Sequence, residues 1–184
     1  MFAVQVNPIV SVSSKKDFFF SVLQVFGASL FLAVCSQISI PLYFTPIPLS
    51  AHTLGIMVIG ATLGSRKGVL SVLAYMAEGC LGLPVFAGGH FGVLWLLGPA
   101  GGYLLGYLFQ VYLVGWFVER QVSFQGIKTL SVMLLSCTVQ MGLGVLWLSF
   151  LVGKSAILMG FYPFVFGEIV KSVAFSFYLK KTKF

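Results

Sequence analysis

The most regular feature of this chain is the alternation of long apolar runs with short segments that hold most of the charged, proline and glycine residues. A membrane-spanning α-helix needs about 20 mainly apolar residues, and the second and third runs are short for straight spans, which indicates tilted, kinked or partly buried helices. The pattern predicts an all-α integral membrane protein with six transmembrane helices in one membrane domain over residues 1–184. The predicted spans cover residues 18–40, 49–63, 69–83, 103–118, 130–152 and 156–179.

The composition also favours a membrane protein. Of the 184 residues, 59% are hydrophobic and 8% are charged, and the mean hydropathy is +1.03, whereas soluble domains carry about 25% charged residues. The sequence contains no P-loop of the form GxxxxGK[ST], so another subunit would have to supply any ATP chemistry. No nucleophile–base set or metal-ligand cluster stands out, so no cofactor is expected and an enzyme is the least favoured class. The cysteines Cys35, Cys80 and Cys137 lie in apolar runs and are interpreted as small hydrophobic residues.

The distribution of basic residues predicts the membrane orientation. The formal net charge of +7 could indicate nucleic-acid binding, but the basic residues lie mainly at the ends of the apolar runs. With six helices, nine of the eleven basic residues fall on one side, Lys154 falls on the other, and Lys171 lies within the last run. The positive-inside rule then places both termini in the cytoplasm, in a multi-pass protein of the cell membrane. The nine are Lys15, Lys16, Arg66, Lys67, Arg120, Lys128, Lys180, Lys181 and Lys183.

A glycine-rich stretch at residues 82–103 separates the third and fourth runs. It holds seven glycines and two prolines and no charged side chain, so it cannot form one regular helix. It is also too apolar for an ordinary solvated loop, and irregular backbone at membrane depth is tolerated only where protein or a cavity surrounds it. The stretch is interpreted either as the wall or lid of a binding site or as a simple connection between helices.

Several polar residues are candidates for ligand binding. Glu168 and Lys171 are three residues apart in the last apolar run, so they project from one face of a helix. Ionisable groups at membrane depth are costly and are usually paired and functional, although a purely structural ion pair is the alternative. His90, in the middle of the glycine-rich stretch, is a second candidate. Glu78 could serve either helix packing or a site. Ser29 and Ala33, four residues apart, form a small-residue pair that would let another helix approach closely.

Six sequence blocks in this order and spacing resemble the BioY family, the biotin-binding S components of energy-coupling-factor (ECF) transporters. The resemblance extends from about residue 27 to residue 175. Three positions differ from the usual family pattern: Ala100 replaces a threonine, His52 replaces a glutamine, and Glu168 replaces a shorter acidic residue. Leu104 also stands where some relatives carry a basic residue. The blocks are Ile38–Pro41, Pro46–Pro48, Leu63–Gly68, Gly82–Gly89, Gly98–Tyr103 and Pro163–Lys171.

The resemblance implies a six-helix S-component bundle that takes up biotin from the outer face. Biotin offers two ureido N–H donors, a ureido carbonyl, an apolar thiophane ring and a carboxylate. In this reading Glu168 accepts from a ureido N–H, His90 bonds the same ring, and Lys171 balances the carboxylate or the ureido oxygen. Gly88, Gly89 and Tyr103, from the family blocks, complete the predicted substrate-binding set.

The resemblance also implies partners. S components present a small-xxx-small pattern to the membrane T subunit, and Ser29 and Ala33 correspond to it here, so the expected complex adds a T component and two cytoplasmic ATPases. Some BioY-like proteins are thought to work without them. Membrane lipid is expected as a neighbour and nucleic acid is not. Two alternatives remain at this stage: an S component for another vitamin, and a membrane bundle in which the polar pair and the glycines serve packing alone.

Overall fold

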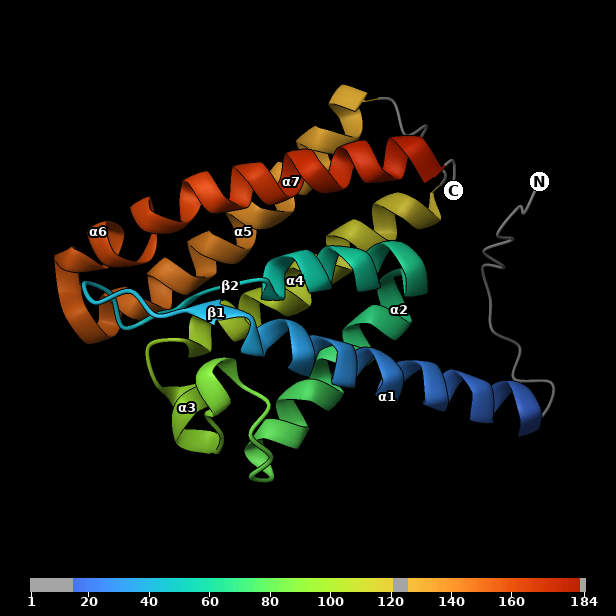
Figure 1. Cartoon of the computed structure of the whole chain (residues 1–184), viewed down its shortest axis with the longest axis horizontal. Helices are drawn as coiled ribbons and strands as arrows, with labels where there is room; N and C mark the ends of the chain where they lie inside the picture. Colours follow the sequence, from blue (N-terminus) through green and yellow to red (C-terminus); the bar gives the residue numbers. More distant parts are fainter. Residues whose placement is uncertain (1–14, 121–125, 183–184) are drawn as a thin grey trace.

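The computed structural model describes residues 15–120 and 126–182 and is almost entirely helical (Figure 1). Four continuous helical stretches in these ranges are long and apolar enough to cross a membrane: Lys15–Gln37, His52–Cys80, Gly101–Glu119 and Ile127–Gly160. The elements in chain order are α1 (Lys15–Gln37), β1 (Ser39–Ile40), β2 (Leu49–Ser50), α2 (His52–Cys80), the 3₁₀ turn η1 (Ala87–Gly89), α3 (Val93–Leu97), α4 (Gly101–Glu119), α5 (Gly126–Val152), η2 (Gly153–Ser155), α6 (Ala156–Gly160) and α7 (Tyr162–Thr182).

Helix α2 consists of two helices that fold back on each other at Gly64. Gly64 has φ 78° and ψ −176° inside an otherwise helical stretch, a conformation that glycine adopts far more readily than other residues. The rings of His52 and Tyr75, near opposite ends of α2, have centroids only 4.8 Å apart. In one straight helix, at 1.5 Å per residue, they would lie about 35 Å apart. The second and third predicted spans are therefore antiparallel neighbours.

With α2 counted as two, the structure has six long helices in the described part of the chain, and the predicted six-helix fold is confirmed. The connection within α2 differs from the prediction. The sequence pattern left residues 64–68 outside the spans, but only Gly64 departs from helical geometry. Arg66 and Lys67 are therefore helical residues, because a single glycine is enough to reverse the chain. The predicted single domain over residues 1–184 includes segments outside the described residues and stays a prediction.

The carboxylate of Glu119, at the end of α4, holds the turn in α2. Its Oε1 accepts a hydrogen bond of 2.7 Å from the Ser65 backbone N–H, and its Oε2 accepts one of 2.7 Å from the Ser65 hydroxyl. The first N–H groups of a helix have no partner within that helix, and a negative charge there is stabilising. Glu119 thus caps the second half of α2, a role that its position among charged residues at a span end did not suggest.

Glycines let α4 pack closely against α5. A Cβ atom added at Gly106 would lie 2.8 Å from the backbone oxygen of Gln140, and one at Gly102 would collide with Trp147. The close packing expected from the four-residue glycine spacing is therefore present at these two positions. Gly98, the first of the series, lies outside the helix, and its carbonyl accepts a 3.0 Å hydrogen bond from Trp147 Nε1.

Two segments differ from the purely helical expectation. The proline-containing connection between α1 and α2 is closed by a short antiparallel pair, β1 and β2, with Ser39 opposite Ser50 and Ile40 opposite Leu49. The last apolar run is divided into α6 and α7 at Phe161, and α7 begins at Tyr162 rather than near Phe164. Pro163 lies in the first turn of α7, where its missing N–H would have no helical partner in any case.

The long helices run between two opposite ends of the molecule, and the turns and short elements lie at these ends. Figure 1 shows the start of α1, the turn within α2 and the end of α7 at one end. The β1–β2 pair, α3 and α6 lie at the other end. This arrangement brings the beginning of α2 next to the middle of α7, where the predicted polar pair is found.

Candidate functional site

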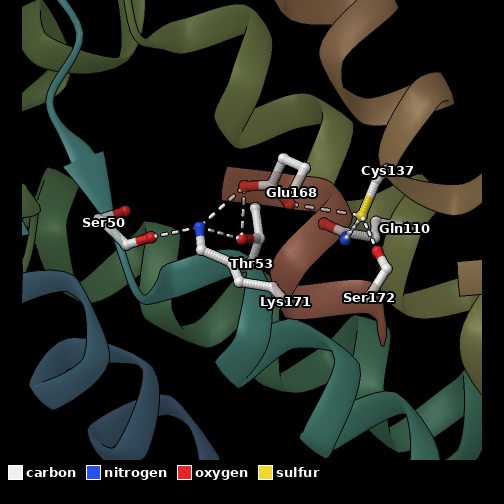
Figure 2. Close-up of polar contacts among 7 residues, drawn as sticks. All are labelled: Ser50, Thr53, Gln110, Cys137, Glu168, Lys171 and Ser172. Carbon is white, nitrogen blue, oxygen red and sulfur yellow. Dashed lines mark hydrogen bonds and ion pairs between the residues drawn. The ribbon is translucent and has the colours of Figure 1, made fainter. Parts of the chain in front are cut away.

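The ion pair predicted from the spacing in the last apolar run is present on α7. Lys171 Nζ lies 2.8 Å from Glu168 Oε1, and both side chains are largely buried, with exposed fractions of 18% for Lys171 and 7% for Glu168. Figure 2 shows the pair pointing toward the junction of β2 and α2 rather than toward the outside of the bundle. The pair therefore belongs to the interior of the protein.

All three N–H donors of Lys171 have partners within the chain. Lys171 Nζ donates to the Ser50 carbonyl oxygen at 2.7 Å, to Thr53 Oγ1 at 2.9 Å and to Glu168 Oε1 at 2.8 Å. An ammonium group has three donors and no acceptor. In this conformation the lysine is saturated, and it ties α7 to the segment that enters α2.

The hydroxyl of Thr53 forms hydrogen bonds with both members of the ion pair. Its hydroxyl accepts from Lys171 and donates to Glu168 Oε1 at 2.8 Å, so the single hydroxyl hydrogen is used once. Glu168 Oε1 therefore receives two strong hydrogen bonds. Sequence reasoning missed Thr53. The available signal was its position beside His52 at the start of the second apolar run, where a polar cluster of Ser50, His52 and Thr53 interrupts the apolar pattern.

The second oxygen of Glu168, Oε2, accepts a weaker hydrogen bond than Oε1. Its Oε2 is 3.4 Å from the thiol of Cys137, and Cys137 in turn contacts Gln110 Nε2 at 3.3 Å and Ser172 Oγ at 3.5 Å, as Figure 2 shows. A thiol is a weak donor. The interpretation of Cys137 as a merely small hydrophobic residue was therefore incomplete, since its sulfur joins the polar cluster.

A small cavity lies beside Glu168. Its volume is about 30 Å³, which leaves room for at most a few water molecules. The end of the connection between β1 and β2, together with β2 and the start of α2, forms one wall, and α4, α5 and α7 form the rest. Its lining consists of Ile47, Pro48, Leu49, Ser50, Thr53, Tyr103, Tyr107, Gln140, Met141, Phe164 and Glu168.

The structure brings together only part of the predicted ligand-binding set. Tyr103 lines the cavity with Glu168, and its hydroxyl donates a 2.6 Å hydrogen bond to the Gly160 carbonyl. His90 is exposed and stacks on Trp95, with ring centroids 4.0 Å apart. Gly88 and Gly89 lie in η1 with positive φ values of 72° and 75°.

None of these last three residues, His90, Gly88 and Gly89, is among the described residues that line the cavity beside Glu168. The glycine-rich stretch has its contacts elsewhere, with Gln37 donating to the Phe86 carbonyl at 3.0 Å and Ser36 donating to the Val85 carbonyl. The ligand role of His90 and the two glycines stays a prediction.

The small-residue pair on α1 faces α2 inside the bundle. Ser29 is fully buried, and its hydroxyl is 2.7 Å from Glu78 Oε1. Ala33 packs against the cluster of buried hydrophobic residues between α1, α2 and α4. In this conformation Ser29 is not on the free surface, and Glu78 has a contact that joins two helices. The partner contact predicted for Ser29 and Ala33 stays a prediction.

Six long apolar helices around a buried, hydrogen-bonded ion pair define a multi-pass membrane protein. The chain belongs to the BioY family, whose sequence model matches residues 10–183. It is 33% identical over 150 residues to the biotin transporter BioY2 of Lactococcus lactis, covering 80% of each chain. It is 34% identical over 160 residues to the biotin transporter BioY of Thermotoga maritima, covering 82% of this chain and 89% of that one.

A solved structure has the same fold. The S-component for biotin from an ECF-type ABC transporter superposes with a TM-score of 0.80, covering 92% of this chain and 94% of the other, at 26% identity. The six-helix S-component bundle expected from the sequence is therefore observed, and the family resemblance is confirmed.

Proposed function

We propose that this protein is the membrane-embedded, biotin-binding component of a biotin uptake system. The observation that carries the proposal is the buried Glu168–Lys171–Thr53 cluster beside a cavity, in a chain of the BioY family. Relatives that match about four fifths of this chain are named biotin transporters, and the solved neighbour is an S-component for biotin. The polar cluster and the apolar lining match a ligand with a polar ring system and an apolar body.

The hydrogen-bond pattern supports different roles for the two carboxylate oxygens of Glu168. Oε1 is occupied by Lys171 and Thr53, both at 2.8 Å. Among the described residues, Oε2 has only the thiol of Cys137, at 3.4 Å, so it retains acceptor capacity for a stronger donor. We therefore assign a ureido N–H of biotin to Glu168 Oε2.

The saturation of Lys171 implies a change of partner when biotin binds. Its three donors are used by Ser50, Thr53 and Glu168, so it can contact the ligand only by releasing one of them. Ser50 and Thr53 are both neutral partners in the cavity wall. Thr53 also bonds Glu168, so the Ser50 carbonyl is the partner that a negatively charged or strongly polarised ligand oxygen would replace favourably. Binding would thereby loosen the link between α7 and β2.

The size of the cavity supports such a movement. About 30 Å³ cannot hold the fused rings and the side chain of biotin, so the walls must separate. The Pro48–Ser50 wall is the mobile candidate, since it lies in a connection with only two paired residues in each strand. Tyr43 and Phe44, in the same connection, are exposed. We expect the bound state to have this connection displaced from α7.

The proposed uptake system includes partner subunits. The neighbour's description as a component of an ECF-type ABC transporter supports a complex with a T component and two ATPases. The chain itself has no P-loop, so ATP would be used by those partners. Ser29 and Ala33 on α1 are the proposed contact with the T component; because Ser29 is buried here, this contact requires α1 to move relative to α2.

The first test is ligand-dependent thermal stability of the purified protein. A ligand that binds only the folded state raises stability by RT ln(1 + [L]/Kd), about 2.7 kcal/mol at a ligand concentration of 100 Kd. Biotin is expected to raise the melting temperature, and riboflavin and thiamine are expected to leave it unchanged. Equal shifts with all three vitamins, or a shift with riboflavin or thiamine alone, would contradict the assignment to biotin.

A further inference from the structure

The buried polar cluster behind Glu168 has no role in the ion pair itself. It is formed by Gln110 on α4, Cys137 on α5 and Ser172 on α7, which have exposed fractions of 2% or less. Polar side chains in the interior of a membrane bundle are costly unless they are paired, and apolar residues would fill the same space without that cost. Gln110 and Ser172 both contact the Cys137 sulfur, and that sulfur contacts Glu168 Oε2, so the cluster ends on the carboxylate oxygen that Lys171 and Thr53 do not contact.

The hydrogen atoms available in the cluster fix the direction of its hydrogen bonds. Cys137 has a single S–H, which is donated to Glu168 Oε2 at 3.4 Å. The Gln110 amide donates to the sulfur at 3.3 Å, and the Ser172 hydroxyl, 3.5 Å from the sulfur, is then the donor in that contact. Two donors to the sulfur polarise the S–H toward the carboxylate.

Gln110 reaches the site only through this thiol. Its Nε2 contacts Cys137, and its Oε1 is buried with no hydrogen-bond partner among the described residues. An unpaired buried acceptor costs about 1–3 kcal/mol. Among the described residues, the Gln110 side chain is therefore linked to Glu168 through the Cys137 sulfur.

We propose that Cys137, supported by Gln110, is a positioning residue for ligand recognition: its thiol fixes the rotation of the Glu168 carboxylate beside the cavity and leaves Oε2 able to accept a strong hydrogen bond. This inference rests on the proposed function, because it assumes that Glu168 contacts the ligand.

Two substitutions separate the hydrogen bond from packing. Cys137→Val keeps the position filled, with a side chain one heavy atom larger, and removes the donor, so biotin affinity should fall roughly tenfold, the scale of one hydrogen bond to a charged group. Cys137→Ser keeps a donor and should stay within about threefold of the unchanged protein. The matched control is Cys35→Ala, which removes another buried thiol, one that lies on α1 outside the cluster, and should leave affinity unchanged.

Infrared spectroscopy of the S–H stretch supplies a readout that packing does not affect. In a protein with Cys35→Ala and Cys80→Ala, the remaining S–H band belongs to Cys137. Biotin should shift this band, because a ureido N–H on Oε2 weakens the carboxylate as an acceptor for the thiol. This measurement also decides the question if Cys137→Val does not fold.

The outcomes separate a failure of the proposed function from a failure of the positioning role of Cys137. If the unchanged protein does not bind biotin, the proposed function fails and this inference fails with it. If it binds biotin while Cys137→Val binds equally well, or while the S–H band does not move, only the positioning role is overturned. A loss of affinity in Cys137→Val with retention in Cys137→Ser, together with a band shift, supports the proposal.

Discussion

Lys171 is the residue on which the polar site depends. It makes three hydrogen bonds, one of them to the carboxylate that balances its charge. Two of its partners, Ser50 and Thr53, come from a segment more than one hundred residues earlier in the chain. The lysine thus has a structural role in joining α7 to α2, in addition to any contact with a ligand.

Removal of this lysine alone should be strongly destabilising. Lys171→Met leaves Glu168 buried without its cation, and breaking one side of a buried ion pair typically costs about 3–5 kcal/mol. We expect a large fall in the melting temperature of the purified protein and loss of biotin binding. An unchanged melting temperature would show that Glu168 finds another partner.

The double variant Glu168→Gln with Lys171→Met is the control for this prediction. It removes both charges, so most of the lost stability should return, while biotin binding should remain absent because the carboxylate and the cation are both gone. Near-native biotin affinity in the folded double variant would mean that the pair is structural only. In that case the assignment of Glu168 and Lys171 to the site would be wrong.

At the scale of elements, the contact between α4 and α5 positions the cavity walls. Tyr103 and Tyr107 on α4 and Gln140 and Met141 on α5 all line the cavity. Their helices approach closely because Gly106 has no side chain at the contact. The α4–α5 spacing therefore affects both stability and the shape of the site.

Gly106→Ala should push α4 and α5 apart. The new Cβ would lie 2.8 Å from the Gln140 carbonyl oxygen and 3.0 Å from its Cα, and backbone atoms cannot move aside as a side chain can. Overpacking of this kind typically costs about 1–3 kcal/mol, so the melting temperature should fall. The matched control is Gly142→Ala on α5, where a Cβ meets nothing within 4 Å.

The control should be neutral or slightly stabilising, since alanine is favoured over glycine in a helix by up to about 1 kcal/mol. Comparable losses of stability in Gly106→Ala and Gly142→Ala would contradict the packing explanation. They would indicate that glycine at both positions is needed for a reason other than helix contact.

At the scale of the whole molecule, the helix arrangement places two groups of basic residues at the same end of the bundle. The start of α1, the turn within α2 and the end of α7 lie at the same end of the bundle (Figure 1). Arg66 and Lys67 follow that turn, and Lys15 and Lys16 begin α1. Lys154 lies in η2, between α5 and the short helix α6.

Reporter fusions test the orientation that the positive-inside rule predicts. A green fluorescent protein fused after Phe184 should fluoresce, and an alkaline phosphatase at the same place should be inactive, if the C-terminus is cytoplasmic. A phosphatase inserted in the η2 turn, at Lys154, should be active. The reverse pattern would invert the topology and place the β1–β2 connection in the cytoplasm, where it could not admit ligand from outside.

The sequence by itself determined the features that depend on local spacing. The apolar runs predicted six long helices because a membrane span needs a set length of apolar residues. The i, i+3 spacing predicted the Glu168–Lys171 contact, because the helix geometry alone brings those side chains together. The glycine spacing in α4 predicted a closely packed helix face for the same reason.

Only the tertiary structure decided which distant residues share the site. Thr53 lies 115 residues from Glu168 in sequence and 2.8 Å from it in space, and Cys137 reaches the other oxygen from α5. The tertiary structure also stacks His90 on Trp95 and places the Ser29 hydroxyl 2.7 Å from Glu78, and the roles predicted for His90 and Ser29 stay predictions. Local periodicity gives each helix a face. Which faces meet depends on how all the side chains pack at once, and a single sequence does not specify those long-range contacts.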